Sequence, residues 1–139
     1  MRPMGKQAIL TKVWKHLRKQ GAKCVAGPDE SCAYRGTNGM QCAIGALIPD
    51  ELYDQYLEGM GAECFIDPSC LDKTSSTNQR RFPVIEKIRP LFAKNIPEGF
   101  LSGLQQIHDY HDVARWERSL TEFADKHGLK VLPLEKEHE

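Results

Sequence analysis

The chain contains one cysteine whose neighbours could make it a nucleophile. Cys42 follows Gln41, and the sequence CAIGALI that it begins predicts a short helix. The start of a helix lowers the pKa of a thiol, and a glutamine side chain can donate a hydrogen bond to an oxyanion. Further along, His108 and His111 flank Asp109, so they could supply a general base and its orienting acid. One hypothesis is therefore a Cys–His hydrolase that uses Cys42, His108 and Asp109.

The same cysteine also fits a packing role. Cys42, Gly45 and Ala46 fall at positions i, i+3 and i+4, which makes a small face that another backbone can approach closely. A thiol buried in such a face would be inert. Our primary expectation is thus that the chain has no catalytic residue, with the hydrolase as the alternative.

The spacing of the cysteines and histidines does not predict a metal centre. The five cysteines, at positions 24, 32, 42, 64 and 70, include no C-x2-C pair. Structural zinc sites usually show such tightly spaced pairs. We therefore expect neither a metal nor another cofactor.

A second group of residues could bind a ligand. Tyr34 and Arg35 precede a Gly-Thr-Asn-Gly turn that contains Asn38. An arginine beside an aromatic ring and a glycine-rich turn can clamp a phosphate or carboxylate, which predicts a small phosphorylated ligand such as a nucleotide. The turn lacks the G-x4-G-K-[ST] pattern of a P-loop. The competing interpretation is a structural salt bridge from Arg35 to Asp50 or Glu51.

The charges of the chain are unevenly distributed. Residues 1–35 carry eight basic and two acidic side chains, whereas residues 36–72 carry seven acidic and no basic ones. Each segment could simply be a solvated surface of one sign. Alternatively, the acidic side docks on a basic partner, since complementary charge guides protein association. The candidate contacts on that side are Asp50, Glu51 and Asp54.

Hydrophobic periodicity predicts a mainly α fold, a single compact domain of about five helices. The glycine-bracketed Asn-Gly turn adds a small β-hairpin near residues 32–42. Pro90 should end or kink the helix predicted over 80–94 early. We expect one helical domain over residues 1–134 and a charged, flexible tail over 135–139. The predicted helical segments are 6–20, 42–48 (short), 49–59, 80–94, 98–110 and 113–127.

Composition narrows the classes of partner. The 139 residues carry 19 basic and 19 acidic side chains, so no net charge favours direct binding to nucleic acid. No apolar run approaches the ~20 residues of a membrane span, and the N-terminus lacks the apolar stretch of a signal peptide. We therefore expect a cytoplasmic protein with reduced thiols and no membrane contact.

Residues 32–53 also carry a resemblance to a known group of proteins. They fit the pattern C-x-YRG-x2-G-x2-CA-[IV]-G-x-LIPD-x-x-Y. This pattern is similar to that of a family of small uncharacterised proteins encoded by tailed bacteriophages and prophages. The sequence LQQIHD at 104–109, Trp116 and HGL at 127–129 match later features of that family.

The resemblance covers roughly residues 6–60 and 100–129, and it implies a phage accessory protein in the cytoplasm of an infected bacterium. It implies no enzymatic activity. Phage accessory proteins commonly bind a host component, so the expected function is to inhibit or redirect a bacterial protein or complex. A host-defence inhibitor such as an anti-CRISPR protein is one form of that function.

Overall fold

The computed structural model describes residues 3–26, 31–36 and 39–130. The mainly α prediction is confirmed, with four α-helices in this part of the chain. These are α1 (Lys6–Gln20), α2 (Ser76–Ile88), α3 (Phe100–Tyr110) and α4 (Trp116–Lys126). Short 3-10 turns make up much of the rest: η2 (Gly45–Leu47), η3 (Asp50–Leu52), η4 (Gln55–Leu57), η5 (Ala62–Phe65), η6 (Pro68–Cys70), η7 (Arg89–Leu91) and η8 (Val113–Arg115).

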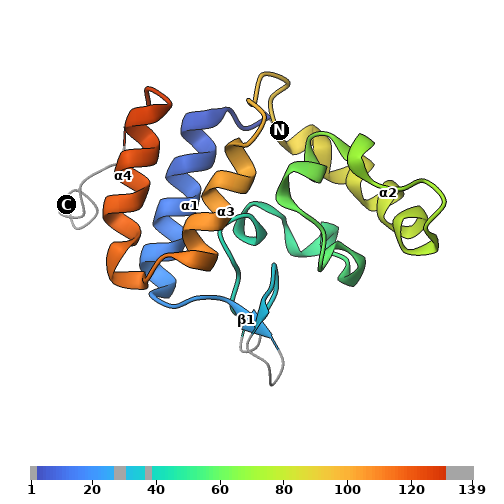
Figure 1. The fold of residues 1–139 in the computed structure, drawn as a ribbon, viewed down its shortest axis with the longest axis horizontal. Helices are drawn as coiled ribbons and strands as arrows, with labels where there is room; N and C mark the ends of the chain where they lie inside the picture. Colours follow the sequence, from blue (N-terminus) through green and yellow to red (C-terminus); the bar gives the residue numbers. More distant parts are fainter. Residues whose placement is uncertain (1–2, 27–30, 37–38, 131–139) are drawn as a thin grey trace.

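Three helices pack together on one side of the domain. Figure 1 shows α4, α1 and α3 side by side. Helix α2 lies on the other side of the domain, beyond the segment that carries the 3-10 turns η2 to η6. Helix α1 presents its apolar stripe to this core, and Gly21 ends it with a left-handed φ of 64° as its amide donates to Leu17 O. The buried residues of α1 are Ile9, Leu10, Val13, Trp14 and Leu17.

The helix predicted over 49–59 is wrong: this stretch forms η3 and η4, separated by extended backbone at Tyr53 and Asp54. The Asp54 carboxylate caps η4 by accepting from the Tyr56 amide. Arg81 of α2 donates to the carbonyls of Tyr56 and Glu58, at 2.6 and 2.9 Å. These tertiary hydrogen bonds satisfy backbone groups that an α-helix would pair internally.

Helix α2 begins before the predicted position 80. Ser75 is its N-cap and accepts from the Asn78 amide, and Asp72 O accepts from the Asn78 side chain at 2.9 Å. The polar sequence before position 80 thus supplies the cap of the helix. At the other end, α2 stops at Ile88 and Pro90 lies in η7, so the expected early end is confirmed.

One antiparallel bridge lies within the predicted hairpin region, and a second small antiparallel pairing lies just before it. Strands β1 (Val25–Ala26) and β2 (Ser31–Cys32) form a short ribbon upstream of the predicted hairpin, with Val25 opposite Cys32. Within 32–42, Arg35 and Gln41 form a single antiparallel bridge, supported by a bond from Gly36 N to Met40 O. Gly39 has the positive φ, 75°, expected of this turn.

Turn η2 packs directly under the chain at Tyr34. A Cβ on Gly45 would lie only 2.2 Å from Tyr34 O, which is a severe clash with backbone. The close approach predicted for the Cys42–Gly45–Ala46 face is therefore confirmed. Among the described residues, no helix has the length and apolarity needed to cross a membrane.

We expect Gly45→Ala to lower the free energy of unfolding by at least about 1–3 kcal/mol, because the new methyl group forces two backbone segments apart. Urea denaturation measures the change. Gly61→Ala is the matched control, since a Cβ there meets nothing within 4 Å and its φ is −66°. Equal losses in the two variants would contradict the close contact.

Candidate functional site

The residue pair Tyr34–Arg35 is built into the interior. Tyr34 is 6% exposed, its ring packs edge-on against Phe65, and its hydroxyl donates to Met60 O. The Glu58 carboxylate accepts from both backbone amides of the pair, at 2.9 and 3.0 Å. Burial is the main cause that raises the pKa of the Tyr34 hydroxyl. Tyr34 therefore acts as an anchor for this segment and leaves little surface for a ligand.

Arg35 is also committed to contacts within the protein. Its guanidinium donates to Gly45 O and Ile48 O, each at 2.5 Å, and to Asp50 Oδ1 at 3.1 Å. It also lies over the Tyr53 ring, 5.0 Å from the centroid. With the side chain only 16% exposed, Arg35 holds the end of η2 in place. The salt bridge expected as the alternative is thus present, to Asp50.

This geometry leaves a poor phosphate site. A phosphate would have to displace the Gly45 and Ile48 carbonyls from the guanidinium of Arg35, and both carbonyls would then lose a charge-assisted bond. Asn38, the third predicted ligand contact, lies outside the described residues.

Cys42 is a buried packing residue. Its side chain is fully buried, and its sulfur accepts from the Gly45 amide at 3.1 Å. The expectation of a thiol at a helix start is wrong, because η2 begins at Gly45 and is only three residues long. Burial dominates instead and raises the pKa of the Cys42 thiol well above its usual range.

His108 and Asp109 belong to a partly buried hydrogen-bond network, in which His108 is fully buried. The Cys24 amide donates to His108 Nε2 at 2.9 Å, so the ring proton must sit on Nδ1, which donates to Asp109 Oδ1 at 2.7 Å. Gln105 donates to the same carboxylate oxygen and accepts from the Ile44 amide. The network joins α3 to the segment after α1 and to the start of the η2 turn.

The network blocks the role proposed for His108 as a base. Nε2 already accepts from the Cys24 amide, and Nδ1 faces Asp109, so neither nitrogen offers a lone pair to the Cys42 thiol. The His108 ring stacks on Trp116 at 5.6 Å, which fixes its orientation further. This geometry favours a structural role for the three predicted catalytic residues.

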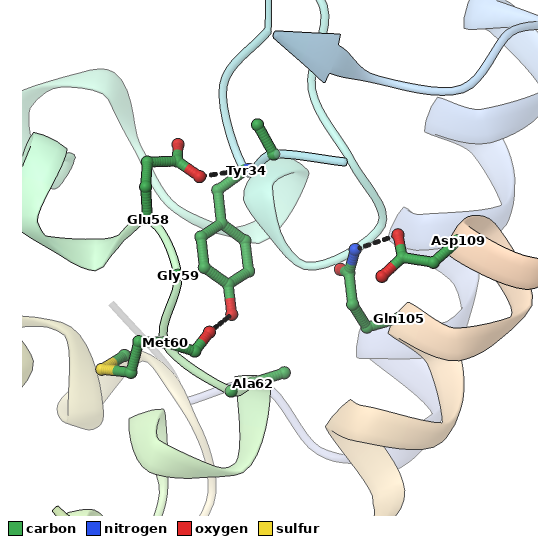
Figure 2. A pocket seen from close by; sticks show the side chains of 9 residues that line it. Tyr34, Glu58, Gly59, Met60, Ala62, Gln105 and Asp109 are labelled. Carbon is green, nitrogen blue, oxygen red and sulfur yellow. Dashed lines mark hydrogen bonds between the residues drawn. The ribbon is translucent and has the colours of Figure 1, made fainter. Parts of the chain in front are cut away.

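A small cavity brings two of the predicted residues together. Figure 2 shows Tyr34 on one wall and Gln105 with Asp109 of α3 on the other, and the floor is the chain at 58–62. The cavity measures about 170 Å³. Small-molecule pockets usually span about 300–1,000 Å³, so this one suits a single small polar group.

A larger hollow of about 580 Å³ lies elsewhere, between η7 and the N-terminal segment. Its walls are mostly apolar, with Arg89, Lys94 and Glu86 among the lining residues. Among the described residues, no predicted site residue lines it.

The acidic candidates differ in how freely they face solvent. The side chain of Asp50 is 87% exposed despite its bond to Arg35, and Glu51 is exposed as well. Asp54 is half-buried and uses its carboxylate to cap η4. We call these three residues the acidic edge. Asp50 and Glu51 are its accessible part.

Within the described ranges, no group of three or more His, Cys, Asp or Glu residues could hold a metal ion. Comparisons of the chain with protein-family models, curated proteins and solved structures give no match. The family resemblance and the function therefore stay predictions, and the case for a function rests on the chain's own geometry.

The residues that sequence reasoning missed are those that pair with backbone at long range. Glu58 holds the Tyr34 and Arg35 amides, and Gln105 connects Asp109 to η2. Glu63 accepts from Gly99 N and Ser102 N and so caps α3. No local pattern identifies them, because their backbone partners lie 23 to 61 residues away.

We expect Arg35→Ala to lower the free energy of unfolding by about 2–6 kcal/mol, since two carbonyls lose their partner and each such loss costs about 1–3 kcal/mol. Asp50→Asn is the control: it removes only an exposed ion pair, worth about 0–1 kcal/mol. Chemical denaturation of both variants measures the difference. Similar losses of free energy in the two variants would mean that Arg35 stabilises the fold through its salt bridge and not through the carbonyl contacts.

We expect iodoacetamide at neutral pH to alkylate Cys42 much more slowly in the folded chain than in the denatured chain. Each unit of raised pKa lowers the thiolate fraction about tenfold, and burial also restricts access. Exposed Cys70 serves as the internal control. Mass spectrometry of timed digests follows both residues. A Cys42 that reacts as fast folded as unfolded would restore the nucleophile hypothesis.

Proposed function

We propose that this chain is a non-enzymatic binding protein that attaches to a bacterial host protein or complex and inhibits or redirects it. The resemblance to small phage proteins suggests that it works in the cytoplasm of an infected bacterium. A counter-defence protein of the anti-CRISPR kind belongs to this class.

The observation that carries the proposal is the exposed pair Asp50–Glu51 on a turn that is anchored to the core. Arg35 donates to Ile48 O and to Asp50, and the Tyr53 amide bonds back to Pro49 and Asp50. The backbone of this turn and the Asp50 carboxylate are therefore held in a defined position before any partner arrives, and Glu51 follows on the same anchored turn. Pre-organised charge of one sign favours fast and selective association with a basic surface.

The site geometry supports binding over catalysis. The Cys42 thiol and the His108 ring are both occupied by internal hydrogen bonds. The Arg35 guanidinium is likewise engaged, so a binder of free phosphorylated ligands has less support than a protein binder.

A second exposed feature offers an independent contact. Tyr110 is 80% exposed and Val113 is also exposed, both at the junction between α3 and α4. Tyrosine is enriched at the centres of protein interfaces because its ring buries a large area at low entropic cost. This junction is the rival contact surface, and the experiment below separates it from the acidic edge.

We expect the double change Asp50→Lys with Glu51→Lys to abolish salt-sensitive capture of a partner from bacterial lysate by the immobilised chain. Asp54 is left intact because it caps η4. Glu98→Lys with Asp125→Lys is the matched control, since both residues are exposed and the net charge changes equally.

Equal loss in the two double variants would point to net charge alone and contradict the acidic edge. Undiminished capture by the first variant, with loss in Tyr110→Ala, would move the contact to the α3–α4 junction. Circular dichroism of each variant checks that the fold is retained.

A further inference from the structure

Two cysteine thiols, one buried in η5 and one exposed in η6, lie in contact. Cys64 Sγ and Cys70 Sγ are 3.0 Å apart, and both residues carry free thiols. Cys64 is 5% exposed, whereas Cys70 is exposed to solvent. Cys24 and Cys42, by contrast, are buried. The pair therefore combines one accessible sulfur with one sheltered sulfur in direct contact.

The backbone between the two thiols holds them in this position. Cys64 lies in η5 and Cys70 in η6, and Asp67 connects the turns. The Asp67 amide donates to Glu63 O, and the Asp67 carboxylate accepts from the Ser69 amide. Because the fold has already brought the sulfurs together, bond formation costs little further chain entropy.

We propose that Cys64 and Cys70 form a reversible dithiol–disulfide site that hydroperoxides oxidise. A disulfide needs the sulfurs at about 2.05 Å, so the contact must shorten by roughly 1 Å. The site goes beyond protein binding and depends on none of the acidic-edge residues.

The reaction begins at Cys70, the sulfur that an oxidant can reach. The Cys70 sulfur attacks one peroxide oxygen, the O–O bond breaks, and the leaving oxygen takes up the thiol proton; with hydrogen peroxide it departs as water. The product is a sulfenic acid on Cys70. Its sulfur now lies beside the Cys64 thiol.

Cys64 completes the reaction. Its sulfur attacks the sulfenic sulfur, the S–O bond breaks, and the oxygen leaves as a second water with the Cys64 proton. In total, two thiols lose two protons and two electrons, and one hydrogen peroxide becomes two waters; an organic hydroperoxide becomes one alcohol and one water. Burial raises the pKa of the Cys64 thiol to about 12, which fits the sheltered second sulfur and not the first attacker.

The cross-link would constrain a segment that the fold depends on. Glu63, next to Cys64, accepts from Gly99 N and Ser102 N and so caps α3. Phe65, on the other side, is fully buried against Tyr34. Oxidation therefore ties η6 to the cap of α3 and should raise the unfolding temperature of the chain.

The test treats the folded full chain with hydrogen peroxide, then alkylates all free thiols in denaturant. Cleavage after Lys, Arg and Glu isolates residues 64–73, which hold both cysteines of the site and no other. We expect this peptide to lose its two alkylatable thiols and about 2 Da of mass, and dithiothreitol to restore both. The peptide that contains Cys42 should keep its thiol and serves as the internal control.

Two variants assign the steps. Cys64→Ser should stop at a Cys70 sulfenic acid that dimedone traps, and Cys70→Ser should leave Cys64 largely unoxidised. Neither variant should show the rise in unfolding temperature that peroxide produces in the natural chain.

A 64–73 peptide that stays fully alkylatable in the natural chain would overturn the proposal. So would a disulfide from either cysteine to another partner, or equal peroxide reactivity in Cys70→Ser. Circular dichroism before oxidation checks that both variants fold, and the result on the natural chain decides the question without them.

Discussion

The arrangement of this domain depends on a guanidinium that holds backbone carbonyls. Arg35 donates to Gly45 O and Ile48 O, while the amide of the same residue is held by Glu58. A 3-10 turn of three residues has almost no stability of its own, because helix formation is cooperative and its first turn is costly. The position of η2 therefore comes from Arg35 and from the contact of Gly45 with Tyr34, and the acidic edge inherits its position from η2.

Hydrogen bonds from side chains to backbone groups also explain the negative charge of the segment 36–72. Glu58 and Glu63 serve backbone amides far along the chain, and Asp54, Asp67 and Asp72 each accept from an amide two residues later. The hydrogen bonds with Ser69 and Thr74 lower the pKa of Asp67 and Asp72, as expected for carboxylates that accept from amides. Much of the acidity is thus a means of satisfying irregular backbone. Asp50 and Glu51 alone lack such a capping bond among the described contacts, which is why they are the better candidates for a partner.

The sequence predicted what depends on short-range pattern and missed what depends on distant partners. The apolar spacing of residues 6–20, the glycine that ends α1 and the small face at Cys42 all concern neighbours in the chain, and the structure agrees with each. The stretch 49–59 has an equally good helical pattern, yet it folds as two turns, because Arg81 and the Asp54 carboxylate compete for its backbone. Local propensity is a weak prior that tertiary contacts override. The sequence also could not show whether the Arg35 guanidinium is free to bind a ligand or is already bonded to backbone carbonyls.

The cysteines show how burial and contact, more than motif, decide where chemistry can occur. Cys42 sits in the most distinctive sequence of the chain, yet desolvation raises its pKa and the Gly45 amide occupies its sulfur. Cys70 lies in a stretch without any motif, but it is exposed and touches a second thiol. A thiolate reacts only if it can form and be reached, and a lasting change of state requires a second sulfur close by. The thiol chemistry that we propose therefore lies between η5 and η6, whereas Cys42 is part of the core.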